Sequence, residues 1–239
     1  MITIARNDIR YYASTPFCYL FAALYFGCVG FGFTTSVISN GGSGMSALFS
    51  GMYGMLILVF PLLTQSVFPS ERTNGTYTLL ISSPVSTSSI VLGKFLGCVS
   101  VFLLTFALTF IFGIIGCAIG VTSFSETISC YLAAFLLGLC FISIGVFISA
   151  VCDRAIHCWL FTSLLLAIFR LLGLFSFYTT DSVLSPILGV TDLFGCFSTL
   201  SLGILNAFPI TYMASFCGFW LFLTCKVIDK RKWGRGDAI

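Results

Sequence analysis

Few residues in this sequence have the types and spacing that catalysis or metal binding requires. The densest group of metal-ligating side chains is Cys152, Asp153, His157 and Cys158, but this short loop fits no standard spacing of a metal site. His157 is the only histidine of the sequence, and no serine motif surrounds it. The sequence therefore predicts no metal site and no catalytic residue in this chain.

The pair Gly93-Lys94 raises the question of a phosphate-binding loop. Such a loop has a glycine five residues before its second glycine and a serine or threonine after its lysine, and these positions hold Ser88 and Phe95. We therefore expect no nucleotide site and no cofactor in this chain. Lys94 is interpreted instead as contacting lipid headgroups or the helix frame at a membrane interface.

Arg170 is the one basic residue that is expected well inside an apolar segment. A charge within a membrane is costly and marks a functional hypothesis by default. It would meet an anionic substrate in a central cavity, pair with Asp181, Asp192 or Glu126, or extend to the outer headgroups. A structural pair or the headgroup contact is favoured over a pathway role, because Arg170 lies in the outer part of its segment.

The composition identifies the elements that must position these residues. Hydrophobic residues make up 58% of the 239 residues and charged residues only 8%, with a mean hydropathy of +1.08. Soluble domains carry about 25% charged residues. The sequence thus predicts an all-α membrane protein, and its length suits about six transmembrane helices in a single domain, 1–239.

Apolar runs and polar interruptions place the segments along the chain. The six spans are expected at about 17–38, 45–68, 90–120, 128–151, 158–177 and 205–227. The other segments are an interfacial N-terminal helix (1–16), a cytoplasmic segment (69–89), outer-face re-entrant or interfacial helices (178–204) and a basic cytoplasmic tail (228–239).

The placement of charge predicts the orientation in the membrane. With the N terminus inside, the basic residues fall on the cytoplasmic side: Arg6, Arg10, Arg72, Lys94, Arg154 and the tail. The outer segments then hold only Glu126, Asp181 and Asp192. Cytoplasmic loops carry an excess of Lys and Arg, so both termini are expected in the cytoplasm. A further span at 183–204 would place the basic tail outside, which the same rule disfavours.

The segment 69–89 is the longest polar interval of the chain. Glu71 lies near a potential helix start, where the helix dipole favours an acid. Tyr77, Leu80 and Ile81 share one face at helical spacing, and Pro84 ends the pattern. Two interpretations are open: a short amphipathic helix that docks a partner, and a solvated loop that only tethers two spans.

This segment resembles the signature of ABC-2 type transporter permeases. The residues concerned are Glu71-Arg72-x-x-Gly75-Thr76-x-x-Leu79-Leu80-x-x-Ser83-Pro84-Val85-Ser86, followed by Ile90-Val91-Leu92-Gly93-Lys94-Phe95. The C-terminal part resembles the gliding-motility branch of that family, through 194–203, Ile210-Thr211-Tyr212 and Lys230-Arg231-Lys232-Trp233. The chain departs from the family at Ser70-Glu71 and Tyr77-Thr78, where members often carry further acids.

The resemblance implies the permease subunit of an exporter in a cell membrane such as the bacterial cytoplasmic membrane. It implies a second permease subunit, alike or different, and a separate ATP-binding subunit that holds ATP and Mg²⁺. It also implies that segment 69–89 forms a coupling helix. The residues expected to couple to the ATPase are Glu71, Arg72, Gly75, Thr76, Tyr77, Leu79, Leu80 and Pro84.

Two alternatives from other functional classes stay open. The gliding-motility resemblance keeps a non-transporting membrane scaffold of a motility or surface machine under consideration. A membrane-embedded, lipid-modifying enzyme is disfavoured, because Arg170 is nearly alone as a polar group within the expected spans. No residue of the spans specifies the transported substrate.

Overall fold

The computed structural model describes residues 15–35, 44–73, 75, 86–120, 124–178, 192–201 and 207–233, and no strand occurs in these ranges. The helices are α2 (Pro16–Thr34), α3 (Gly44–Thr64), α4 (Pro69–Thr73), α6 (Thr87–Ala118), α7 (Phe124–Val151), α8 (Ala155–Tyr178), α10 (Leu193–Ser201) and α11 (Ala207–Trp233). Among the described residues, six helical stretches are long and apolar enough to cross a membrane. The predicted all-α class with six spans is confirmed.

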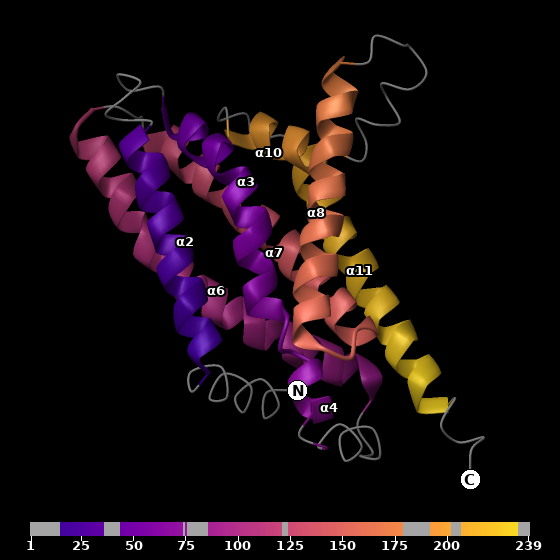
Figure 1. The fold of residues 1–239 in the computed structure, drawn as a ribbon. Helices are drawn as coiled ribbons and strands as arrows, with labels where there is room; N and C mark the ends of the chain where they lie inside the picture. Colours follow the sequence, from indigo (N-terminus) through magenta and orange to yellow (C-terminus); the bar gives the residue numbers. More distant parts are fainter. Residues whose placement is uncertain are drawn as a thin grey trace.

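The long helices run up and down in one bundle (Figure 1). The start of α2, the short helix α4 and the end of α11 lie at the same end of this bundle, and we call it the α4 end. α10 lies crosswise at the opposite end, between α8 and α11 in the chain. Because the candidate spans are six, the start of the first and the end of the last lie at the same end of the bundle.

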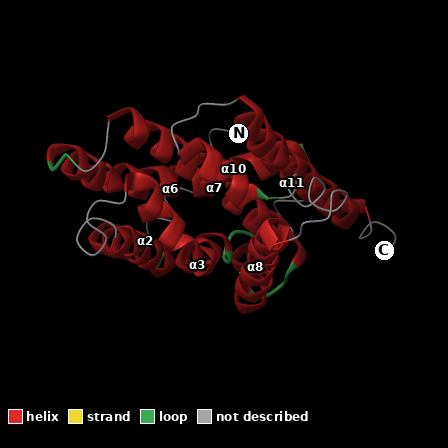
Figure 2. Ribbon diagram, turned by 90° about the horizontal axis from the view of Figure 1, so that it is seen from above, coloured by secondary structure: helices red, strands yellow, loops and turns green. Residues whose placement is uncertain are grey.

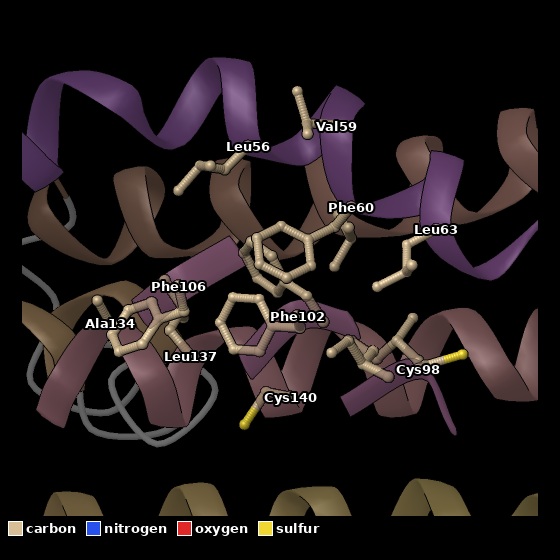
Figure 3. Packing of buried hydrophobic residues seen from close by; sticks show 14 of the residues in the cluster. Leu56, Val59, Phe60, Leu63, Cys98, Phe102, Phe106, Ala134, Leu137 and Cys140 are labelled. Carbon is tan, nitrogen blue, oxygen red and sulfur yellow. The ribbon is translucent and has the colours of Figure 1, made fainter. Parts of the chain in front are cut away.

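α7 is the central helix of the bundle. It packs against α3, α6, α8, α10 and α11, while α2 packs on α3 and α6 at one side (Figure 2). Aromatic rings fill the centre: the ring centroid of Phe60 lies 5.4 Å from that of Phe102 and 5.2 Å from that of Phe141. Figure 3 shows Phe60 and Phe102 facing each other between α3 and α6. These rings meet in tilted and edge-to-face arrangements, which are favourable for aromatic pairs.

Pro61 lies near the end of α3, as the sequence places it in the second span. A proline has no N–H for the carbonyl four residues earlier, which weakens the helix around it. The carbonyl of the next residue, Leu58, accepts the indole N–H of Trp159 from α8 at 3.2 Å. α3 ends at Thr64, before the predicted end at residue 68, and the Phe68 N–H is accepted by the Ser149 hydroxyl of α7 at 3.2 Å.

Gly145 of α7 allows the end of α3 to approach closely. A Cβ atom built at Gly145 would overlap the Thr64 hydroxyl and lie 2.7 Å from the Thr64 Cβ. Gly145→Ala is therefore expected to lower the free energy of unfolding by about 1–3 kcal/mol, the usual cost of overpacking a core. Unfolding of the purified protein by dodecyl sulfate in mixed micelles measures this change.

Gly218→Ala is the matched control for Gly145→Ala. Gly218 also lies inside a long helix, α11, but nothing stands within 4 Å of a Cβ built there. Alanine at an open helical position is neutral or stabilising by up to about 1 kcal/mol. Equal destabilisation by the two substitutions would show that the contact between Gly145 and Thr64 does not limit packing.

The segments outside the spans are described in part. The predicted segments have parts outside the described residues: 1–14 of the interfacial helix, 74 and 76–85 of the coupling segment, 179–191 and 202–204 of the outer segment, and 234–239 of the tail. α11 continues to Trp233, so residues 228–233 of the predicted tail belong to the last helix. The third span starts at Thr87, three residues before the predicted start.

The cytoplasmic location of the α4 end is a prediction that reporter fusions test. A green fluorescent protein fused after Ile239 is expected to fluoresce, and an alkaline phosphatase at the same site to be inactive, because the basic end of α11 is retained inside. A phosphatase fused after Ser123, between α6 and α7, is expected to be active. The reverse pattern would invert the orientation of the whole bundle.

Candidate functional site

α4 holds the first residues of the family-like motif at the end of the bundle. The helix spans Pro69–Thr73, and the Thr73 hydroxyl donates to the Pro69 carbonyl at 2.6 Å. Gly75 follows with φ of +72°, and its N–H donates to the Arg72 carbonyl at 3.3 Å. A left-handed residue after a helix is most readily glycine. The left-handed backbone conformation at position 75 therefore explains why the motif has a glycine there.

Glu71 and Lys94 form an ion pair between α4 and α6. The Lys94 Nζ lies 2.6 Å from the Glu71 Oε1, with side chains 3% and 23% exposed. The same ammonium donates to the Val67 carbonyl at 3.3 Å and lies 5.3 Å from the centroid of the Phe68 ring. Of the two contacts expected for Lys94, the one with the helix frame is present and the one with lipid headgroups is not, because the ammonium is buried between neighbouring segments of the protein.

Arg72 binds the end of α7. Its Nη1 donates to the Cys152 carbonyl at 2.7 Å and its Nη2 to the Ala150 carbonyl at 2.6 Å. Its Nη1 also lies 2.5 Å from the Asp153 Oδ1. The last carbonyls of a helix have no partner inside the helix and carry its partial negative charge. The Arg72 guanidinium therefore supplies hydrogen-bond donors to carbonyls at the end of α7 and places a positive charge next to their partial negative charge.

Arg231 of α11 binds the same end of α7 from the other side. Its Nη2 donates to the Val151 carbonyl at 2.6 Å, and its Nη1 lies 3.5 Å from the Asp153 Oδ1. The last turn of α7 has no basic residue of its own, so its cations come from other helices. This contact gives a physical reason for the helical continuation of α11 beyond its predicted end.

Five charged residues thus meet at the α4 end, and we call them the ionic cluster: Glu71, Arg72, Lys94, Asp153 and Arg231. The cluster fastens α4 to α6 and α7, and α7 to α11. The Asp153 side chain is 79% exposed, so its ion pairs alone contribute little. The hydrogen bonds to the α7 carbonyls carry most of the stabilisation, whereas the buried Lys94–Glu71 pair matters mainly because removing one partner leaves an unpaired charge.

Two members of this cluster, Asp153 and Arg231, are not predicted from the sequence. The sequence indicates Asp153 only as a potential metal ligand, and Arg231 only as part of the basic tail and of the gliding-motility resemblance. The predicted topology contained a usable signal, because it places Glu71 and Asp153 on the same side as Arg72, Lys94 and the tail. Opposite charges at the same membrane interface tend to pair.

The loop between α7 and α8 has a structural role and not a chemical one. Burial raises the pKa of the Cys152 thiol, Asp153 acts in the same direction, and Arg72 and Arg231 oppose it. A thiol with a raised pKa stays protonated at neutral pH and is a poor nucleophile. Within the described ranges, no three His, Cys, Asp or Glu side chains gather as metal ligands.

Arg170 lies toward the other end of the bundle, at the contact of α8 with α10. Its Cζ stands 4.8 Å from the centroid of the Phe194 ring, a cation–π distance. The Asp192 Oδ1 accepts the Phe194 N–H at 3.0 Å, and the Asp192 carboxylate packs against Gly173 and Gly195. Of the predicted partners, Asp192 therefore belongs to the same helix contact as Arg170. A role in the pathway stays a prediction.

The other predicted coupling residues lie outside the described residues. They are Thr76, Tyr77, Leu79, Leu80 and Pro84. Glu71, Arg72 and Gly75 are described, and the structure gives each an intramolecular contact at the α4 end. Contact of any of them with an ATPase stays a prediction.

Comparison with known proteins identifies the family. The family model described as ABC-2 family transporter protein matches residues 13–209. No curated protein matches the chain. The matched region covers most of the chain and includes α4 together with five of the six candidate spans. The gliding-motility branch stays a prediction. The chain belongs to the ABC-2 family of transporter proteins, the membrane permeases of ABC transporters.

Proposed function

We propose that this chain is the permease subunit of an ATP-driven exporter and that its ATP-binding subunit docks at the α4 end. The observation that carries the proposal is the ionic cluster, which fastens a five-residue helix at the bundle's edge to the spans α6 and α7. A loop that only tethered two spans would need neither a buried lysine nor an arginine on the end of the central helix.

The ionic cluster would transmit movement of a bound partner to the membrane-spanning helices. A displacement of α4 would move α3 through the chain, α6 through Lys94 and α7 through Arg72. α7 is held in turn to α11 by Arg231. A partner that prefers one position of α4 would therefore bias the whole bundle between two arrangements.

The remaining features of the proposed transporter follow the family resemblance. A second permease subunit, alike or different, would complete the pathway. ATP and Mg²⁺ would be bound by the partner ATPase. Export across a cell membrane, the bacterial cytoplasmic membrane in particular, is the proposed direction.

A non-transporting scaffold is the second candidate, favoured by the resemblance of the α11 end to the gliding-motility branch. The two candidates separate by whether ATP turnover moves a solute. A scaffold would bind the same ATPase and hydrolyse ATP with no solute crossing the membrane. Reconstitution of the complete assembly into vesicles, with lumenal solutes identified by mass, distinguishes them.

The docking claim is tested by purifying the tagged protein from its native membrane in mild detergent and identifying the co-purifying chains by mass. We expect a stoichiometric P-loop ATPase. Tyr77→Ala with Leu80→Ala should remove it, because these apolar residues lie outside the ionic cluster and are expected to face the partner. Leu104→Ala, at a 65% exposed position on α6, is the matched control and should retain it.

The permease must stay intact for this test to count. Its amount in the membrane and its elution as a single species should be the same for all three proteins. Retention of the ATPase by the double variant would contradict docking through residues 76–85. Absence of any ATPase from the wild type, after crosslinking as well, would contradict the transporter proposal itself.

A further inference from the structure

The last two turns of α11 carry a basic surface that the ionic cluster does not use. Lys226, Lys230 and Lys232 are exposed on this helix, whereas Arg231 turns inward to α7. Asp229 is the one acid between Lys226 and Trp233, and its carboxylate makes no ion pair with the three lysines in the described structure. The stretch therefore keeps an excess of exposed positive charge.

Two of these lysines continue an exposed aromatic face. Phe219, Phe222, Lys226 and Lys230 follow one another at spacings of three, four and four residues, which places them on one side of a helix. The two phenylalanine side chains are 57% and 59% exposed. The buried residues of the same stretch, Thr224 and Ile228, lie on the side that Arg231 shares. Apolar side chains thus precede cations along one outward face.

Contact with the aromatic ring positions the first ammonium. The Lys226 Nζ lies 5.4 Å from the centroid of the Phe222 ring, so the charge is held next to an apolar surface. Lys230 lies one turn further toward the end of the helix. The candidate span of α11 runs from Ala207 to Lys232, which places both lysines at its basic end. A ligand here would meet cations and apolar rings together.

We propose that Lys226 and Lys230 bind the phosphate headgroup of an anionic phospholipid, with Phe219 and Phe222 against its acyl chains. The order of aromatic and basic residues matches the order of acyl and headgroup regions across one leaflet. A soluble protein partner would not reach the aromatic residues, because they belong to the membrane-spanning part of α11. The charge on this face selects phosphatidylglycerol over a zwitterionic lipid.

The site adjoins the ionic cluster through one residue. Lys230 precedes Arg231, whose guanidinium binds the Val151 carbonyl and Asp153 at the end of α7. A bound headgroup would hold this turn of α11 against the leaflet and steady the contact with α7. The binding itself is independent of the proposed transport function, and its test measures lipid binding alone.

Native mass spectrometry of the full purified chain, titrated with phosphatidylglycerol or phosphatidylcholine, tests the proposal. The first bound phosphatidylglycerol is expected to be tighter than the first phosphatidylcholine. Lys226→Gln with Lys230→Gln should raise its Kd by about fivefold per lysine, from the attraction of a basic residue to an anionic surface. Lys226→Arg with Lys230→Arg should keep the wild-type affinity, because the charge is retained.

Lys232→Gln is the matched control for Lys230→Gln alone, since each removes one charge, from different sides of the same helix end. It should leave the first Kd within about twofold. Equal weakening by Lys232→Gln and by Lys230→Gln alone would show attraction to overall charge and overturn the site. Unchanged phosphatidylglycerol affinity of the double glutamine variant would also overturn the proposed lipid site. This result is expected if another protein, and not lipid, covers this face of α11. All variants are compared at matched monodispersity on size exclusion.

Discussion

Glu71→Gln is expected to lower the free energy of unfolding by about 2–3 kcal/mol, because it leaves the Lys94 ammonium buried without its carboxylate. Breaking a fully buried pair from one side costs about 3–5 kcal/mol, and Glu71 is 23% exposed, which reduces the figure. The Val67 carbonyl remains as an acceptor but carries no full charge. Dodecyl sulfate unfolding in mixed micelles, followed by tryptophan fluorescence, measures the loss.

A double-mutant cycle separates the ion pair from other effects of Glu71. Lys94→Met alone should cost less than Glu71→Gln, about 1 kcal/mol, because the remaining carboxylate can still reach water. The double variant Glu71→Gln with Lys94→Met should unfold within about 1 kcal/mol of the wild type, since no buried charge is left. Losses that simply add in the double variant would show that the pair does not hold α4 to α6.

Arg72→Ala is expected to be the other strongly destabilising change, with a loss of about 3 kcal/mol. It removes two charge-assisted hydrogen bonds to the Ala150 and Cys152 carbonyls, each contributing about 1.5–3 kcal/mol without full additivity. Arg72→Lys should recover less than half of the loss, because a single ammonium cannot replace a planar fork that binds two acceptors. The same unfolding measurement applies.

Two neighbouring arginines provide controls for Arg72. Arg231→Ala should cost about 1 kcal/mol, because its side chain is 35% exposed and bonds one α7 carbonyl. Arg154→Ala should be neutral within about 0.5 kcal/mol, since Arg154 is exposed in the same loop. A loss at Arg154 equal to that at Arg72 would indicate a general effect of positive charge at this end instead of specific bonds to α7.

Arg72 also connects stability to the proposed function. If α4 transmits the movement of an ATPase, Arg72→Ala should lower transport by tenfold or more while the ATPase stays bound through residues 76–85. A tenfold change requires only about 1.4 kcal/mol of coupling, less than the bonds that Arg72 makes. Loss of ATPase binding would show instead that Arg72 is needed for docking. Unchanged transport would show that α4 does not transmit the movement of the ATPase.

The amino-acid sequence by itself determined the membrane class, the six spans and the family. These properties depend on local composition: a span is an uninterrupted run of apolar residues, and runs such as 128–151 are visible without any knowledge of neighbours. The motif from Glu71 to Pro84 is local in the same sense, since its residues lie close together in the chain. Pro61 lies inside α3, within the apolar run 45–68 from which the second span is predicted.

Only the tertiary structure decided which charges meet. Lys94 and Glu71 are 23 residues apart, and Arg231 and Asp153 are 78 residues apart, so no short pattern connects them. Their pairing depends on α6 and α11 packing beside α7, which is set by the shapes of buried side chains and not by charge. The sequence predicts that Lys94 lies near a membrane interface. Whether it faces lipid or another helix depends on the rotation of α6, and helix packing fixes that rotation.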